Sequence, residues 1–240
     1  MARIAGSCST DELSVSVEHC RACPRLVEWR ERVARDKRAA FREDVYWGRG
    51  VPGFGDPAAR MVVVGLAPAA HGANRTGRMF TGDRSGDWLF RAMHRAGFAS
   101  RPDATARDDG LELRDAYVTA AVRCAPPANK PTPQERRNCR PFLERELELL
   151  REARVVVALG GFSFAHVLRI WRDRGGDIPR PAPKFAHGVE LSLGASSDGL
   201  PAVTLLGSYH PSQQNTFTGT LTEPMFDAVW QRARELMDRA

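Results

Sequence analysis

The chain has 240 residues, of which 42% are hydrophobic and 27% are charged, so it is long enough to bury the core of one domain and unlike a disordered segment. Its 35 Lys and Arg residues exceed its 29 Asp and Glu residues, and the formal net charge of +6 suits a polyanionic partner without requiring one. No apolar run approaches the roughly 18 residues of a membrane span, and the N-terminus has no signal-peptide core, so we expect a cytoplasmic protein without a membrane partner. The low aromatic content of 8% favours a monomer.

Residues 1–15 lack clear periodicity and are expected to form a flexible tail, which leaves 16–240 as a single domain. A charged amphipathic helix is predicted to begin after Cys23 and to run towards Phe41. Four short apolar runs then have the composition of buried strands, at 61–66, 117–122, 155–159 and 202–206. Helical patterns lie between them, near 87–97, 132–150 and 162–171. This alternation predicts an α/β fold with a parallel sheet covered by helices.

The cysteines of the predicted domain form a close pair, Cys20 and Cys23, and a wide pair, Cys124 and Cys139. Disulfides are rare in the reducing cytoplasm, so the spacing calls for a metal or redox explanation. Iron–sulfur clusters and structural zinc both accept four thiolates, and ligand type alone does not decide between them. The alternative is that Cys124 and Cys139 are buried core thiols. Against this, Cys124 follows a strand at a point where core packing ends, whereas Cys8 lies in the expected tail.

Two polar loops are expected at the carboxyl ends of the strands, where parallel sheets bind ligands. The loop at 65–86 is long and glycine-rich, which is typical of functional loops, and its Arg75, Arg78 and Arg84 are candidates to contact phosphates. At the other end, His210 leaves the last strand beside a proline-stiffened polar loop. We therefore expect both loops to meet at one rim of the sheet.

Five stretches of this sequence resemble the uracil-DNA glycosylase superfamily, specifically its cluster-containing family 5, also called type B. The matching residues extend in the family's order from about Cys20 to Thr222. The motifs are Gly65-Leu66-Ala67-Pro68-Ala69, Phe80-Thr81-Gly82-Asp83, Val122-Arg123-Cys124-Ala125-Pro126-Pro127, Asn129-Lys130-Pro131-Thr132-Pro133, and His210-Pro211-Ser212 with Asn215.

The resemblance implies a three-layer α/β/α sandwich with a central four-stranded parallel sheet. It also implies a monofunctional glycosylase of base excision repair, which flips a damaged nucleotide out of double-stranded DNA and hydrolyses the bond between base and sugar. The expected substrates are DNA with uracil or other deaminated bases. The expected cofactor is a [4Fe–4S] cluster held by Cys20, Cys23, Cys124 and Cys139.

Within that family, Phe80 matches the residue that stacks on the flipped base, and His210 matches the histidine that stabilises the anionic leaving base. Backbone N–H groups around Ala67 and Ala69 are expected to bind the same anion. Ala67 stands where the best-studied relatives carry a water-activating carboxylate, so the resemblance points to Asp83 instead. Asn129 is expected to assist it in catalysis, and Asn215 to contact the substrate. The competing interpretation of Asp83 is a helix N-cap.

A second departure is Ala120, which occupies the place of the family's uracil-reading Asn and predicts broader activity, including hypoxanthine and ethenocytosine. The loop after His210 matches the family's minor-groove wedge, with Gln213 and Gln214 at its tip. Arg123 and Lys130 are expected either to contact phosphates or to remain solvated charges. The competing functions are a non-catalytic four-cysteine metal-dependent nucleic-acid-binding module and a small iron–sulfur electron carrier, neither of which explains the loop at 65–86.

Overall fold

The computed structural model describes residue 4 and residues 6–238, and its centre is a six-stranded sheet with the order β1-β3-β2-β4-β6-β5. The four expected strands are present as β2 (Met61–Gly65), β3 (Ala116–Ala120), β4 (Val155–Leu159) and β6 (Val203–Ser208), and they pair in parallel. Two antiparallel edge strands were not expected, β1 (Phe54–Gly55) and β5 (Glu190–Leu193). β1 is only two residues long, which is too short to leave a periodicity in the sequence.

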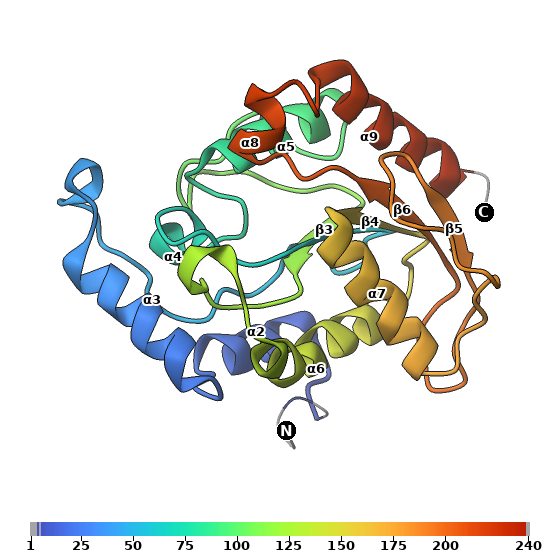
Figure 1. Cartoon of the computed structure of the whole chain (residues 1–240), viewed down its shortest axis with the longest axis horizontal. Coiled ribbons are helices and arrows are strands. Elements are labelled where there is room, and N and C mark those ends of the chain that lie inside the picture. The colour runs from blue at the N-terminus through green and yellow to red at the C-terminus, as the bar shows by residue number, and fades with distance from the viewer. Residues whose placement is uncertain (1–3, 5, 239–240) are drawn as a thin grey trace.

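Helices cover both faces of the sheet, which confirms the three-layer α/β/α architecture (Figure 1). One face packs against α5 (Arg84–Arg95) and α9 (Glu223–Asp238), and the other packs against α6 (Pro133–Leu149) and α7 (Gly161–Asp173). Val63 points into the first layer, whereas Val62 and Val64 point into the second. A strand that is buried on both faces requires apolar residues at every position, and this explains the unbroken valine runs of β2 and β4.

The N-terminal segment corrects the expectation of a flexible tail over residues 1–15. Residues from Thr10 onward form α2 (Thr10–Glu18), which Ser9 caps by accepting a hydrogen bond from the backbone N–H of Glu12. Leu13 and Val17 are buried against α6, because they lie four residues apart on one face of the helix. Two buried apolar residues in a nine-residue helix are too weak a pattern for detection by periodicity. Residues 1–3 and 5 lie outside the described part of the chain.

The next helix, α3 (Pro24–Asp36), ends before Phe41 because Lys37 adopts a positive φ of 50°, and a one-turn helix η1 (Ala39–Phe41) follows. Three short elements complete the structure at the carboxyl ends of the strands, namely α4 (Ala73–Thr76), η2 (Pro127–Asn129) and α8 (Gln213–Phe217). Among the helices of the described residues, none is long and apolar enough to cross a membrane.

Candidate active site

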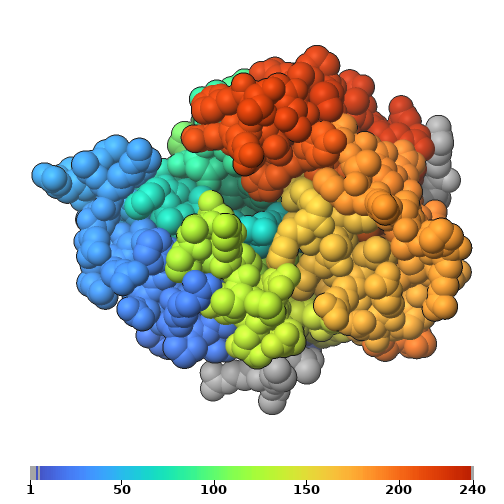
Figure 2. Space-filling view, viewed as in Figure 1, coloured from blue at the N-terminus to red at the C-terminus, as the bar shows by residue number. Residues whose placement is uncertain are grey.

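A pocket of about 620 Å³ lies at the carboxyl ends of the parallel strands, within the range of small-ligand sites. Segments that follow β2, β3, β4 and β6 meet there, and Figure 2 shows their parts of the chain converging on one face. The predicted meeting of the two polar loops therefore occurs. The residues that line the pocket are Leu66, Ala67, Pro68, Ala69, Met79, Phe80, Asp83, Arg84, Ser85, Asn129, Leu159, Gly160, Gly161, Phe162, His210, Ser212, Gln213 and Gln214.

Phe80 presents its ring above the end of β2. A Cβ at Gly65 would lie 2.6 Å from Cζ of Phe80, so the glycine makes room for the ring. The backbone of Phe80 has a positive φ of 53°, which is unfavourable for a bulky residue and persists only where the surroundings enforce it. Gly86 supplies part of that enforcement, because any side chain there would overlap the Phe80 carbonyl. The fold thus holds this aromatic ring in the pocket at a cost in backbone strain.

Asp83 both caps a helix and lines the pocket. Its Oδ1 accepts a hydrogen bond of 3.0 Å from the backbone N–H of Gly86 at the start of α5, while Oδ2 lies against Gly72, where any Cβ would overlap it. Burial raises the pKa of Asp83, although hydrogen bonds from the backbone N–H groups of Gly86 and Ser85 oppose the shift. The two interpretations of this residue, cap and pocket carboxylate, are therefore compatible.

His210 faces Phe80 across the pocket, with 6.0 Å between the ring centroids. Burial lowers the pKa of His210 to about 4, so the imidazole is neutral at neutral pH and has one N–H to donate. Asn215 supports this residue from behind: its Nδ2 donates a 2.9 Å hydrogen bond to the carbonyl of His210. Asn215 is not one of the described residues that line the pocket, and its contact with the site is this hydrogen bond to the backbone of His210.

Asn129 reaches the pocket from the segment that follows β3. It is exposed, and both Asn129 and the preceding Ala128 have positive φ values, of 56° and 51°. Two successive left-handed residues turn the chain sharply after β3 and bring the Asn129 amide to the site. Ala67 and Ala69 also line the pocket, as expected.

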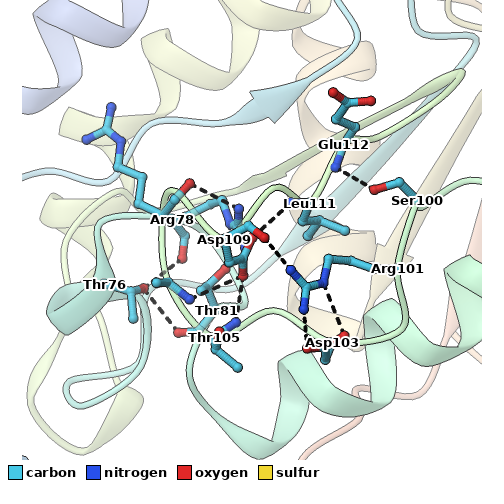
Figure 3. A network of polar contacts seen from close by, with 12 residues as sticks. Thr76, Arg78, Thr81, Ser100, Arg101, Asp103, Thr105, Asp109, Leu111 and Glu112 are labelled. Atoms are coloured by element: carbon cyan, nitrogen blue, oxygen red, sulfur yellow. Dashed lines mark hydrogen bonds and ion pairs between the residues drawn. The ribbon is translucent and has the colours of Figure 1, made fainter.

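Arg78 was expected to contact phosphates, and the structure contradicts that expectation. Its side chain is 6% exposed and forms a 2.7 Å ion pair with the equally buried Asp109, in the network of Figure 3. Its Nε donates to Thr81 Oγ1 at 2.9 Å, next to Phe80 in the chain. Although burial acts to raise it, the pKa of Asp109 is held well below its usual range by hydrogen bonds from Arg78 and from backbone N–H groups. Arg78 therefore braces the turn that presents Phe80.

Two further arginines are also engaged inside the protein. Arg75 pairs with Asp44 at 2.6 Å and donates to the carbonyls of His71 and Gly82, so it ties the loop to itself. Arg123 is 1% exposed and forms an ion pair with Glu146, which is also buried. The buried Arg123 is therefore not available to DNA, and the partly exposed guanidinium of Arg75 is already engaged by three protein acceptors. Lys130 is exposed beside the rim, and Gln213 and Gln214 line the pocket.

Phe217 and Arg84 form an exposed pair that the sequence interpretation did not recognise. The guanidinium of Arg84 lies 4.3 Å from the ring centroid of Phe217, at the end of α8. Phe217 is 65% exposed, which is unusual for an aromatic residue, and Arg84 is itself exposed on the pocket wall. The signal in the sequence was a single aromatic residue within the polar run that follows His210.

The four cysteines line one small pocket between α3, α6 and the end of β3. Three of the sulfur atoms accept hydrogen bonds: Cys124 from Arg30 Nη1 at 2.9 Å, Cys139 from the backbone N–H of Arg123 at 3.2 Å, and Cys23 from Asn138 Nδ2 at 3.5 Å. In the described part of the chain, no group of three or more His, Cys, Asp and Glu residues is placed to hold a single metal ion.

Burial raises the pKa of Cys124 to about 11 and the pKa of Cys139 well above its usual value, so both are protonated thiols at neutral pH. A bound metal would have to stabilise their thiolate form for them to act as ligands. Cys8 is exposed and stands apart from these residues.

Comparison with known proteins agrees with this geometry. A family model described as the uracil DNA glycosylase superfamily matches residues 52–234, and the chain belongs to that superfamily. Proteins named type-5 uracil-DNA glycosylase are similar over nearly the whole chain, which confirms the branch that the motifs indicated.

The relative from Mycobacterium tuberculosis is 52% identical over 96% of this chain and 83% of its own length. The relative from Thermus thermophilus is 51% identical over 90% of this chain and 93% of its own length. The relative from Pyrobaculum aerophilum is 44% identical over 93% of this chain and 91% of its own length.

Proposed function

We propose that this protein excises uracil from DNA by hydrolysing the bond between the base and C1′ of the sugar, which leaves an abasic site for repair. The observation that carries the proposal is the convergence of Phe80, Asp83 and His210 in one pocket of a chain that belongs to the uracil DNA glycosylase superfamily. Its similarity to proteins named type-5 uracil-DNA glycosylase supports uracil as the substrate.

In the reaction that we propose, each of these residues has a separate task. The strained Phe80 ring stacks on the flipped base and fixes its plane. As the bond from C1′ to the base breaks, the base takes the bonding electrons and becomes an anion, while the sugar becomes cationic. The neutral His210 imidazole donates a hydrogen bond to the anionic base, assisted by backbone N–H groups of the Ala67 and Ala69 wall. Asp83 orients the water that adds to C1′ and accepts its proton.

A neutral imidazole is well suited to this task. A charged imidazolium would attract the anionic base more strongly, but burying that charge in the pocket would offset the gain. The buried neutral ring already lies in the pocket and needs no reorganisation when the anion develops. Asn215 serves the same end, since its hydrogen bond to the His210 carbonyl fixes the direction in which the ring approaches the base.

Base selection is proposed to be broader than uracil. Ala120 is buried at the end of β3, is not among the described residues that line the pocket, and has no side-chain hydrogen bond to offer a base. A site without the amide that the resemblance expects at this position would not penalise a base with a different pattern of donors and acceptors. We therefore propose hypoxanthine and ethenocytosine as additional substrates.

Double-stranded DNA is proposed to lie across the pocket mouth, between Lys130 on one side and the pair of Arg84 and Phe217 on the other. Arg84 and Lys130 are exposed cations that are suited to phosphates, and Gln213 and Gln214 line the pocket. The exposed Phe217 ring is the apolar surface best suited to fill the gap that a flipped nucleotide leaves in the stack. All of these residues come from one chain, so a monomer suffices for the reaction.

A [4Fe–4S] cluster is the proposed cofactor, with Cys20, Cys23, Cys124 and Cys139 as its ligands. The residues fit the group, because four thiols surround one pocket and N–H donors reach three of the sulfurs. Bound there, the cluster would cross-link the start of α3 to the segment that follows β3 and to α6, a structural contribution outside the pocket where the base is cleaved.

The proposal is tested with end-labelled duplexes that contain uracil, hypoxanthine or ethenocytosine, or no damage, incubated with the purified chain and then treated with alkali. Strand cleavage at the damaged position is expected for the three damaged duplexes and not for the undamaged one. A non-catalytic binding module or an electron carrier would leave every strand intact. Cleavage at uracil alone would refute the broader substrate range but retain the glycosylase.

A further inference from the structure

Arg30 is a buried arginine with an unusual set of partners. It lies on α3, is 2% exposed, and donates from Nη1 to the sulfur of Cys124 at 2.9 Å and from Nη2 to the carbonyl of Cys20 at 3.0 Å. Its Nε is buried and has no hydrogen-bond partner. Both of its contacts therefore lead to proposed cluster ligands.

Among the described residues, the other two deeply buried arginines each have a carboxylate partner, which Arg30 lacks. Arg78 is paired with Asp109, and Arg123 is paired with Glu146. Within the described residues, Arg30 forms no ion pair with a carboxylate, and its hydrogen bonds end on a sulfur and a carbonyl. A guanidinium does not lose its proton in proteins, and a buried charge without a counter-charge strongly destabilises the folded state. The native protein must therefore place negative charge next to this side chain.

We propose that Arg30 is the charge partner of the cysteine-ligated iron–sulfur cluster: its guanidinium donates to the Cys124 sulfur and compensates the negative charge that four thiolates bring to the site. The inference rests on the proposed cofactor and deepens it. A cationic donor at a ligand sulfur stabilises the more negative, reduced cluster and strengthens retention of the metal. Arg30 is thus a positioning residue that acts on the cluster and does not touch the DNA.

Arg30 also connects the cluster to the wall of the active site. Asn74 of α4 is fully buried, and its Nδ2 donates to the carbonyl of Arg30 at 3.3 Å and to that of Ala70 at 3.4 Å. The backbone N–H of Asn74 donates to the carbonyl of Ala69, a pocket residue, at 3.0 Å. Loss of the cluster would leave Arg30 as an uncompensated charge and would loosen α3 from the segment that shapes the Ala69 wall.

The test uses the full chain, purified without oxygen, and compares the wild type with Arg30→Met, Arg30→Lys and a control, Arg32→Met. Arg32 is on the same helix but its side chain is 47% exposed. The readouts are iron and acid-labile sulfide per chain, the rate at which a chelator removes iron, and the midpoint potential of the cluster. Circular dichroism verifies that each variant is folded.

We expect Arg30→Met to lose iron about 10- to 100-fold faster, the usual effect of removing a residue that supports metal ligands, and to have a lower midpoint potential. Arg30→Lys keeps the charge but not the fork geometry, so it should lose iron faster than the wild type and more slowly than Arg30→Met. Arg32→Met should lose iron at the wild-type rate. If Arg30→Met does not fold, the rate and potential of Arg30→Lys decide the question.

Iron retention and potential that are unchanged in both Arg30 variants would overturn the inference, as would a wild type that contains zinc and no iron. The proposed function fails on a different measurement, because it depends on uracil excision by the wild type. An iron-containing chain that shows the Arg30 effect but leaves uracil in place would refute the function alone.

Discussion

Replacing Asp83 by Asn separates the two tasks that the structure gives this residue. Asn is as good an N-cap as Asp, so the Oδ1 acceptor for the Gly86 N–H is retained and only the charge is lost. If the carboxylate activates water, the single-turnover rate of uracil excision should fall by about 10²- to 10⁴-fold, which corresponds to about 3–5 kcal/mol of activation barrier. Asp83→Ala should lose the same activity and the cap as well.

The stability of these variants gives the second half of the test. Loss of the cap costs about 1 kcal/mol, which lowers the melting temperature of a domain of this size by about 2–4 °C, so Asp83→Ala should melt lower than Asp83→Asn. Burial raises the pKa of Asp83, so ionising it opposes folding, and Asp83→Asn should be at least as stable as the wild type at neutral pH. That advantage should vanish as the pH falls through the raised pKa towards the ordinary value of 3.8.

The measurements are quenched single-turnover kinetics on a uracil duplex and thermal unfolding, each over a series of pH values. In the wild type, the rate should decline as the pH falls through the raised pKa of Asp83, and this decline should be absent from the residual activity of Asp83→Asn. The matched control is Asp87→Asn, an exposed residue on the same helix, which should keep the wild-type rate. A wild-type rate in Asp83→Asn would refute the catalytic assignment and leave only the cap.

Three further results are expected. His210→Ala should lower the single-turnover rate by about 10²- to 10³-fold. Because burial lowers the pKa of His210 to about 4, the wild-type rate should show no His210 ionisation near neutral pH, and a step near pH 6.5 in the pH profile would contradict this. Phe217→Ala should reduce excision from duplex DNA by about tenfold or more while excision from single strands is preserved, and equal losses on both substrates would exclude a role in filling the stack. Asp109→Asn leaves Arg78 buried without its counter-charge and should destabilise the fold by about 3–5 kcal/mol. The pKa of Asp109 is lowered in the folded state, so its ionised form stabilises the fold above the ordinary pKa of 3.8, and this stabilisation is lost as the pH falls through the lowered pKa. The difference in melting temperature between the wild type and Asp109→Asn should therefore shrink in acid, and a constant difference would contradict this.

The parallel strands of the fold could be predicted from the sequence because the hydrophobic pattern of each strand lies within a few consecutive residues. Runs such as Met61–Gly65 and Val155–Leu159 are apolar at every position, which only a strand buried on both faces requires. Four such strands separated by helices predict a parallel sheet, and its carboxyl ends place the loop at 65–86 beside the loop that follows His210. The prediction of one pocket for Phe80, Asp83 and His210 followed from that topology and from the motifs.

The sequence did not determine which charged residues face solvent. Arg78 and Arg84 look alike in the loop at 65–86, yet Arg78 is buried on Asp109 and Arg84 lies exposed over Phe217. The same holds for Arg30, whose environment depends on Cys124, far away in the chain. An arginine is buried or exposed according to whether the folded chain brings an acceptor to it, and such long-range pairing leaves no periodic trace. The sequence therefore determined the four parallel strands and the location of the site, while only the tertiary structure decided the edge strands, which charges support the site and which remain available for DNA.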